Sequence, residues 1–355
     1  MSLTAFVVRI ETSSDEPHIG DREVKSFLEN LSEQRAFRID VGAARIDFSS
    51  IYLDENEGAI ATEPDWGDPS ICRTLVFDGW LENRDELIAE LAINGANTAS
   101  TDSQIVLKSI ARWGEKAVHR LYGEYSFVCL TKTPRSDAPD VFAVRDKVGI
   151  RPLFYSEVNE KLAISNFLGA LSVVPWIGSG INDGYAAEFL CAEVWSTRET
   201  LFRNVKRVCG GHFLLKVGRT SPVARRYWRP KSSTESNSTP DSIAAMRRTL
   251  FQAVLGASRS VGPLGVQISG GIDSSTVACV VAELMAQREL RAPSTVGMSQ
   301  IFPGYACDES DYIDQIEREL PFPIRKLSPI YATRDQLVSM VRRTRYPYYS
   351  YAATS

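Results

Sequence analysis

The stretch that decides the fold is "VQISGGIDSSTVAC", residues 266–279. An apolar run ends at the glycine pair Gly270-Gly271, and helix-forming residues follow an acid and two serines. A glycine pair lets the main chain turn sharply and bring its amides close to a ligand. The start of a helix offers unpaired N–H groups and a partial positive charge, which suit an anion. The stretch therefore predicts a strand, an anion-binding loop and a helix.

The polar residues of this loop indicate which anion it binds. Ser269, Ser274 and Ser275 add hydroxyl donors to the loop amides. Asp273 would repel a bare phosphate, so we expect a cation such as Mg²⁺ beside it. The loop has no GK[ST] ending, so it is not the kind that holds a transferred γ-phosphate.

The residues around this loop alternate between strand and helix patterns. Such alternation is typical of βαβ units and a parallel sheet. We expect strands at 264–268, 295–302 and 324–330, and helices at 274–288 and 309–319.

The first part of the chain has a different pattern, in which strands outnumber helices. Residues 124–130 and 140–146 are typical strands. Residues 102–114 are typical of a helix that Asp102 or Ser103 caps and Gly114 ends. This mixture favours an antiparallel α+β sandwich.

A segment rich in Ser, Thr and Pro separates these two parts. Residues 229–242 contain no apolar anchor, so we expect an exposed linker between domains at 1–228 and 243–355. The second domain should open with a helix that Asp241 or Ser242 caps. Its predicted apolar stripe contains Ile243, Met246, Leu250 and Val254.

Composition narrows the class of protein. The 355 residues carry a net charge of −4, with 44% hydrophobic and 24% charged residues, as in a soluble globular protein. We expect no nucleic-acid or membrane partner, because neither a basic surface nor a membrane-length apolar run is present. No signal peptide is recognised, so the prediction is a cytoplasmic protein whose six scattered cysteines are reduced core thiols. Three isolated histidines argue against a histidine metal centre.

"SGGIDSS" resembles the pyrophosphate-binding loop of the N-type ATP pyrophosphatases, as found in the asparagine synthetase family. Further stretches are similar to that family in order and spacing: "FDGWLENRDEL" (77–87), the helix and strand at 101–130, "VRDKVGIRPLFY" (144–155) and "ETLFRNVKRVCGGHFLLKV" (199–217). The resemblance implies an N-terminal nucleophile-hydrolase-like glutaminase sandwich followed by a partial α/β synthetase domain.

The resemblance also implies a reaction and its ligands. Members of the family adenylate a carboxylate with ATP and Mg²⁺, release pyrophosphate, and let an amine attack the acyl-adenylate. By this resemblance the loop Ser269–Ser275 binds pyrophosphate and Asp273 binds the metal. Ile268 and Met298 sit where the family clasps adenine. The expected substrate is a small-molecule or peptide carboxylate.

The glutaminase part departs from the family pattern. The family's nucleophilic Cys is replaced by Ser2, which leaves only a weak candidate for the catalytic residue. The family's Asn-Gly pair supplies an oxyanion-hole amide and is here Asp78-Gly79, and an ionised carboxylate cannot donate a hydrogen bond. Arg45 and Asp102 match the family's glutamine-holding positions. We therefore expect a degenerate glutamine site and no working glutaminase.

A second departure lies at the other end of the sequence. The family's second glycine-acid segment (GxGGDE) and later catalytic lysine are absent, so we expect a fragment or a synthetase domain that a separate chain completes. Three alternatives stay open beside an asparagine-synthetase-like ligase: a lasso-peptide cyclase, a β-lactam-synthetase-like enzyme, or a non-catalytic subunit or binding module.

Several other residues have simpler interpretations. Glu309 and Asp311 could bind a metal, although a helix capped by Asp308 with solvent-facing neighbours is favoured. Cys307 is interpreted as a packed thiol. The tyrosines between 346 and 351 are interpreted as a surface that other sequence covers.

Overall fold

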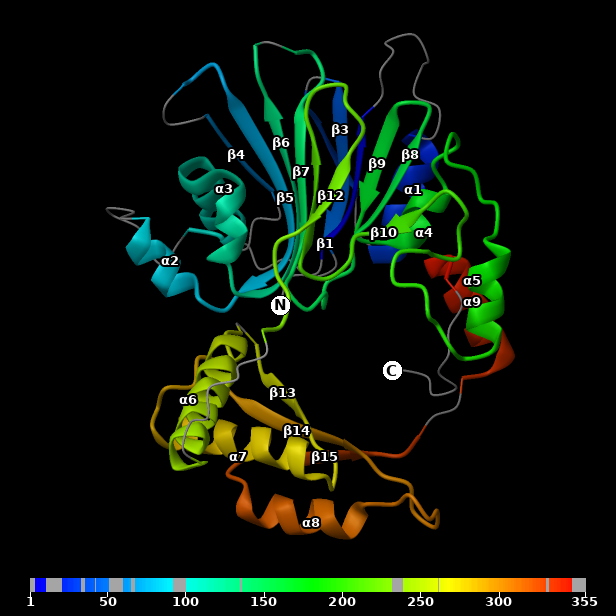
Figure 1. Cartoon of the computed structure of the whole chain (residues 1–355). Helices are drawn as coiled ribbons and strands as arrows, with labels where there is room; N and C mark the ends of the chain where they lie inside the picture. The colour runs from blue at the N-terminus through cyan, green and yellow to red at the C-terminus, as the bar shows by residue number, and fades with distance from the viewer. Residues whose placement is uncertain are drawn as a thin grey trace. The chain divides into compact units, whose positions relative to one another are not determined.

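The computed structural model describes most of the chain (Figure 1). The described residues are 4–10, 21–32, 36–41, 43–50, 60–64, 68–91, 100–134, 136–231, 239–260, 262–329 and 332–346. Within these ranges no helix combines the length and apolar character needed to cross a bilayer. The chain divides into two compact units, Met1–Pro230 with Val338–Tyr348 and Lys231–Leu337 with Tyr349–Ser355.

Unit 1 contains two six-stranded sheets in which all strand pairs are antiparallel. The first sheet has the order β10-β8-β9-β1-β3-β2 and the second β12-β11-β7-β6-β5-β4. The strands of the first sheet are β1 (Thr4–Ile10), β2 (Phe37–Val41), β3 (Ala44–Ser50), β8 (Phe154–Val158), β9 (Lys161–Ser165) and β10 (Lys206–Arg207). Those of the second are β4 (Ile60–Pro64), β5 (Cys72–Leu81), β6 (Gly123–Lys132), β7 (Asp140–Arg145), β11 (His212–Lys216) and β12 (Val223–Arg226).

The central strands are buried on both faces, which explains their continuous apolar runs. Along β1, Phe6 and Val8 face a core shared with Val76 and Val128 of the second sheet. The alternate residues of β1 belong to a separate core on the opposite face of the sheet. The two sheets therefore pack against each other, and each has its own apolar outer layer.

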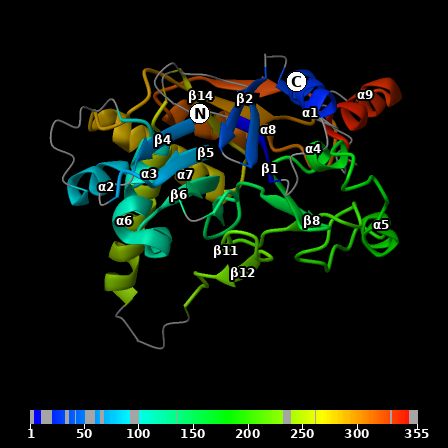
Figure 2. The same cartoon turned by 90° about the horizontal axis from the view of Figure 1, so that it is seen from above.

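Helices cover both outer faces of this double sheet (Figures 1 and 2). On the second sheet, α2 (Arg84–Glu90) and α3 (Asp102–Trp113) complete one outer core, and the short 3-10 helix η1 (Gly114–His119) follows α3. On the first sheet, α1 (Asp21–Ser32) and α4 (Leu168–Ser172) complete the other, and α5 (Asp183–Leu190) follows. The result is a helix–sheet–sheet–helix sandwich, as the sequence predicts.

The ends of α3 show where local sequence signals were only partly correct. Thr101, not Asp102 or Ser103, is the N-cap, and it forms a capping box with Gln104. Asp102 therefore lies in the first turn. Gly114 ends the helix with φ 58°, as predicted.

Unit 2 is built on a three-stranded parallel sheet with the order β13-β14-β15. Its strands are β13 (Leu264–Gln267), β14 (Thr295–Gln300) and β15 (Ile324–Leu327), and its helices are α6 (Thr239–Ala257), α7 (Ile272–Ala286) and α8 (Ser310–Glu319). The predicted alternation of strand and helix is confirmed. Val266, Ile268, Ala278 and Ile313 belong to its core.

The first helix of unit 2 differs in detail from its prediction. Helix α6 includes Thr239, so Asp241 and Ser242 lie inside the helix and do not cap it. The predicted stripe is only partly buried, since Ile243 is 64% and Met246 is 73% exposed. Part of the predicted linker is thus helical, and residues 232–238 lie outside the described ranges.

The last described helix, α9 (Arg334–Thr344), was not predicted. The sequence placed all of residues 243–355 in the second domain, but Val338–Tyr348 group with unit 1. Gly169 of α4 explains part of this packing, because a Cβ there would lie 2.0 Å from the Thr344 carbonyl oxygen. The tyrosines at 348, 349 and 351 lie outside the described residues.

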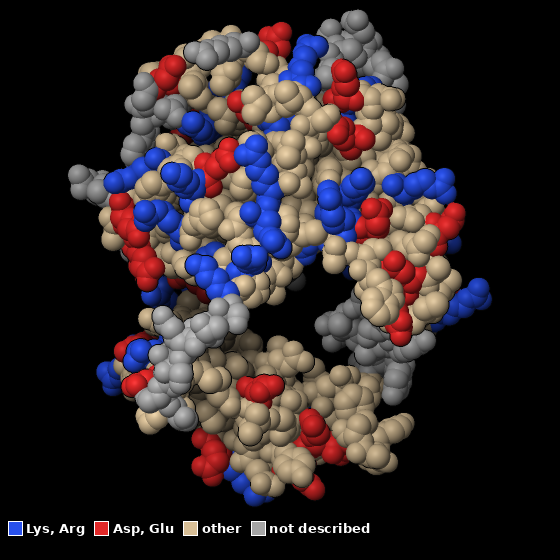
Figure 3. Space-filling view, viewed as in Figure 1, with Lys and Arg blue, Asp and Glu red and all other residues tan. Residues whose placement is uncertain are grey.

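The surface and the cysteines agree only in part with expectation. On the face of unit 1 in Figure 3, acidic side chains lie among basic ones. All six cysteines are free, but Cys129 alone is fully buried, and burial raises its pKa to about 12. Cys191, Cys279 and Cys307 are exposed, so the interpretation of all six as core thiols, Cys307 included, was wrong.

Candidate functional site

The serine-glycine loop follows β13 and leads directly into α7. Gly271 is the N-cap of α7, with φ −80° and ψ 158°, and no side chain caps the helix. The N–H groups of the first turn therefore have no partner within the helix. A helix start without a side-chain cap is a suitable place for an anion such as a phosphate.

The hydroxyls of the loop bind its own backbone. Ser274 Oγ accepts from the Ser269 amide at 3.0 Å and lies 2.9 Å from Ser269 Oγ. Ser275 Oγ donates to the Gly271 carbonyl at 2.7 Å. The Gly271 amide also donates to Ser269 Oγ, at 3.3 Å. In this structure the hydroxyls fix the shape of the loop, and the uncapped first-turn amides of α7 remain as donors for a ligand.

Close packing, and not an unusual backbone angle, requires a glycine at position 270. Neither Gly270 nor Gly271 has a positive φ. A Cβ on Gly270 would lie 2.9 Å from Cβ of Tyr312 and 3.0 Å from Cβ of Glu309. The predicted sharp turn is therefore better described as a close approach between the loop and the start of α8.

Glu309 provides the most informative contact of the loop. Its Oε2 accepts a hydrogen bond from the Gly270 amide at 2.9 Å. The Glu309 carboxylate is thus an anionic group that is bound by a loop amide. Glu309 is also the N-cap position of α8, without a side-chain cap bond, so the expectation that Asp308 caps this helix was wrong. Asp308 instead accepts from the Phe302 amide and from Ser310 Oγ.

The two residues expected to clasp adenine lie on opposite faces of the parallel sheet. Ile268 is 1% exposed and packs in the core of unit 2. Met298 is 41% exposed, and its Cε lies 2.9 Å from where a Cβ on Gly265 would be. The Ile268 amide donates to the Met298 carbonyl at 2.9 Å, so the strands are neighbours although the two side chains do not meet.

A bound Mg²⁺ is compatible with the residues of the loop. Asp273 is the acid of the first turn of α7. Within the described part of the chain, no cluster of three or more His, Cys, Asp or Glu side chains could hold a metal alone. Mg²⁺ often uses one or two protein carboxylates together with phosphate oxygens and water. One carboxylate beside an anion loop therefore fits a metal that arrives with a phosphate ligand.

Asp78, one of the residues predicted to form a degenerate glutamine site, lies beside the start of β1. Asp78 Oδ1 accepts from the Thr4 amide at 3.0 Å, and Asp78 Oδ2 lies 3.9 Å from Nη1 of Arg151. Asn166 bridges β1 by accepting from the Phe6 amide at 3.0 Å and donating to the Thr4 carbonyl at 2.5 Å. Burial raises the pKa of Asp78, although the charge of Arg151 and the Thr4 amide oppose this effect. Asp78 therefore acts as a hydrogen-bond acceptor for β1, whereas a residue of an oxyanion hole acts as a donor.

Gly79 follows Asp78 in β5, and Asp102 contacts Leu81, the last residue of the same strand. Gly79 has φ 127°, and a Cβ there would lie 2.0 Å from the Glu124 carbonyl oxygen, so only glycine fits. Asp102 accepts from the Leu81 amide at 2.9 Å and from Arg84 at 2.6 Å. The carboxylate of Asp102 is therefore already engaged by protein donors.

Arg45 is not brought to this site. It pairs with Arg9 across the strands, whereas Ser50 pairs with Thr4, so Arg45 lies at the other end of β3 from Asp78. Its guanidinium lies 3.7 Å from Asp21 and 3.9 Å from Asp40. Ser2, the weak nucleophile candidate, lies outside the described residues.

Three contacts were not predicted from the sequence. Asn166 holds β1, Arg84 neutralises Asp102, and Glu309 binds the loop amide. Arg84 lies within the quoted stretch 77–87, and Glu309 was noted only as a possible metal ligand. No sequence pattern marks Asn166, because its partners are more than 150 residues away in the chain.

Comparisons with known proteins agree with this two-part organisation. A glutamine amidotransferase domain model matches residues 68–228, and an asparagine synthase model matches residues 245–350. The chain thus joins an amidotransferase-type domain to an asparagine-synthase domain. It belongs to the asparagine synthetase family.

Curated relatives are similar at modest identity. "Amidase chyE" of Penicillium rubens is 29% identical over 209 residues, which is 58% of this chain and 29% of that protein. "Asparagine synthetase [glutamine-hydrolyzing] 3" of Bacillus subtilis is 26% identical over 62% of this chain and 35% of its own length. "Asparagine synthetase [glutamine-hydrolyzing] 2" of Oryza sativa subsp. japonica is 25% identical over 79% and 44%. The chain thus spans less than half the length of each of these relatives.

A solved structure titled "Structure of the allosteric regulatory enzyme of purine biosynthesis" is similar with a TM-score of 0.44 and 15% identity, over 92% of this chain and 82% of that one. The fold of unit 1 is therefore defined here by its strand order and layers, and not by this superposition.

The buried carboxyl of Asp78 predicts a pH-dependent stability. Asp78→Asn keeps an oxygen that can accept from the Thr4 amide and removes the buried charge. In the folded protein the pKa of Asp78 is raised above the ordinary value of 3.8. The protonated carboxyl therefore contributes stability below its ordinary pKa, and this contribution is lost as the pH rises through the folded pKa. We expect Asp78→Asn to become more stable relative to the wild type between pH 4 and pH 8, measured from urea midpoints. The exposed control Asp311→Asn should lack this trend, and an equal Asp78→Asn difference at both pH values contradicts the interpretation.

The contact between Glu309 and Gly270 predicts competition with anions. Removing the carboxylate in Glu309→Ala frees a loop amide, so pyrophosphate should bind more tightly by about 1 kcal/mol, roughly fivefold. The measurement is calorimetry with pyrophosphate in EDTA, with Glu319→Ala at the far end of α8 as the control. Weaker binding by Glu309→Ala would show that the carboxylate does not compete with the anion.

Proposed function

We propose that unit 2 binds Mg·ATP at the Ser269–Ser275 loop, as part of a ligase that activates a carboxylate for attack by an amine. The observation that carries this proposal is the uncapped start of α7 at the carboxyl end of a parallel strand, with its free amides beside Asp273. The carboxyl ends of strands are the usual ligand-binding edge of open α/β sheets. Membership in the asparagine synthetase family supports an ATP-dependent ligase.

In this proposal each group of the loop has a separate role. ATP supplies the adenylyl group that activates the carboxylate, and Mg²⁺ offsets the charge of the phosphates. The loop amides hold the phosphate oxygens, and the Ser269–Ser274 contact keeps the amides in position. Asp273 orients the metal, and Glu309 leaves Gly270 when the anion arrives. The open face of the sheet at Met298 offers apolar surface for the base.

We further propose that unit 1 keeps the glutaminase fold without its activity. Asp78 accepts hydrogen bonds at a position where the family has a donor, and Asp102 is neutralised by Arg84. Arg45 is engaged at the other end of its strand. The amine then comes from another source, which could be ammonia or an amine of the substrate itself, as in lasso-peptide cyclases and β-lactam synthetases. The chain spans less than half the length of the relatives named above. The proposal therefore concerns the ligands that these 355 residues bind, and not the complete reaction.

The nucleotide proposal is tested with two matched carboxylates. Asp273 and Asp311 each hold the second position of a helix, in α7 and α8 respectively. Asp273→Ala should weaken Mg·ATP binding by about 1–3 kcal/mol, the scale of a charge-assisted contact, while Asp311→Ala should bind as the wild type does. Calorimetry with and without Mg²⁺ measures the effect. Equal affinities of Asp273→Ala and wild type in Mg²⁺ would remove Asp273 from the metal site.

The glutaminase proposal predicts an absence of glutamine turnover. Purified protein incubated with glutamine should release no glutamate above a Ser2→Ala control, because the thiol and the amide donor are both replaced. The measurement is glutamate production over time. Turnover of roughly 1 per second, near the lower end of common enzyme rates, would contradict the proposal.

A further inference from the structure

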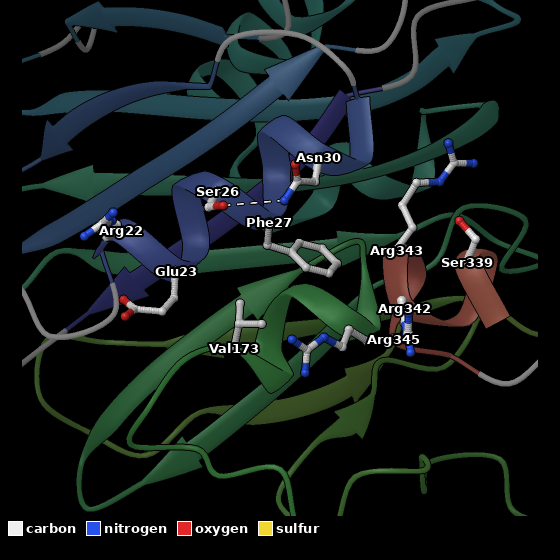
Figure 4. Close-up of a pocket in the computed structure, with 10 residues that line it drawn as sticks. All are labelled: Arg22, Glu23, Ser26, Phe27, Asn30, Val173, Ser339, Arg342, Arg343 and Arg345. Carbon is white, nitrogen blue, oxygen red and sulfur yellow. Dashed lines mark hydrogen bonds between the residues drawn. The ribbon is translucent and has the colours of Figure 1, made fainter.

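A basic groove lies between α1 and the end of α9 in unit 1 (Figure 4). Its volume is about 650 Å³, within the range of small-molecule sites. Its charged lining comprises Arg22 and Glu23 of α1 and Arg342, Arg343 and Arg345 at the end of α9. None of these residues belongs to the Ser269–Ser275 loop or to the degenerate glutamine site.

The arginine wall of this groove is held in place by specific packing. Thr344 lies against Gly169 of α4 so closely that no larger residue fits at 169. Tyr346 packs against the core under α1 and α4, and its hydroxyl lies 3.0 Å from that of Tyr185. Arg345 has a φ of 56°, which ends α9 and turns the chain toward this core. The guanidinium groups are therefore presented by an anchored element.

Positively charged side chains dominate the lining of the groove. In the described part of the chain, Arg22, Arg342 and Arg345 form no ion pair. Glu23 is the single carboxylate of the lining, against four guanidinium groups. The chain as a whole has a net charge of −4, so this concentration of positive charge is local. The positive groups of the lining repel one another, and a bound anion lowers this repulsion. The lining therefore favours an anionic ligand.

The remaining lining adds neutral hydrogen-bonding groups and an apolar base. Ser26 and Asn30 lie on α1, with 3.5 Å between Asn30 Nδ2 and Ser26 Oγ, and Ser339 lies on α9. Phe27 of α1 and Val173, which follows α4, add apolar surface to the lining (Figure 4). A ligand with both an anionic head and a less polar body matches this arrangement.

We propose that this groove binds a small phosphorylated molecule. A guanidinium pairs its N–H groups with phosphate or carboxylate oxygens, but several arginines need several anionic oxygens at one place. A phosphate or diphosphate provides them in a compact group, whereas a single carboxylate provides only two. The hydroxyl and amide groups of Ser26, Asn30 and Ser339 complete the polar contacts, and Phe27 and Val173 contact the body of the ligand.

The test uses inorganic pyrophosphate as the probe, with the full chain in EDTA. Amide resonances of Ser26, Asn30 and Ser339 should shift saturably as pyrophosphate is added, which locates binding in the groove independently of any binding at the α7 loop. These groove shifts should be lost or need at least tenfold more pyrophosphate in the double variant R342A/R345A, since each charged contact removed weakens binding. Raising the salt concentration should weaken the same shifts.

The control is Arg334→Ala, which removes an arginine from the other end of α9 and should leave the groove shifts unchanged. Thermal unfolding of each variant checks that it folds. If R342A/R345A does not fold, the shifts of the wild-type resonances still test the proposal. Shifts confined to Gly270 and Gly271, or equal groove binding by R342A/R345A and the wild type, would overturn the proposal.

Discussion

The first-turn amides of α7 have no partners within the helix, and β13, α7 and the start of α8 meet at the loop that precedes them. The parallel sheet brings β13 to an end at this point, and Gly270 allows the start of α8 to approach. The carboxylate of Glu309 then binds one loop amide. An acidic side chain in this place shows that the loop attracts negative charge even within the protein. The same electrostatic demand is the physical basis for assigning a phosphate ligand to the loop.

Our proposal that unit 1 keeps a glutaminase fold without its activity requires a fold that does not depend on the catalytic groups. The two sheets share a core that depends on alternating apolar residues and not on the site. Asp78 binds the amide of Thr4, the first described residue of β1, and Asn166 binds the carbonyl of the same residue. These bonds give Asp78 a structural role that a carboxylate can fill. The fold therefore accommodates a carboxylate at position 78.

The sequence predicted the layers, the alternation of unit 2 and the loop, because each depends on local periodicity and turn chemistry. It predicted less well where distant residues decide the outcome. Arg45 matched a motif, yet the strand register puts it beside Arg9. Ile268 and Met298 were expected to act together, yet the pleat directs them to opposite faces. Helix α9 lacked a clear pattern, since its packing depends on Gly169, far away in the chain.

The central claim is that the loop between β13 and α7 is the nucleotide site, and a crystal structure with Mg²⁺ and pyrophosphate tests it most directly. The account predicts an anion at the amides of Gly270, Gly271 and the first turn of α7, with Glu309 displaced from Gly270 and the metal beside Asp273. An unchanged Glu309–Gly270 hydrogen bond, with pyrophosphate bound elsewhere or not at all, would contradict it.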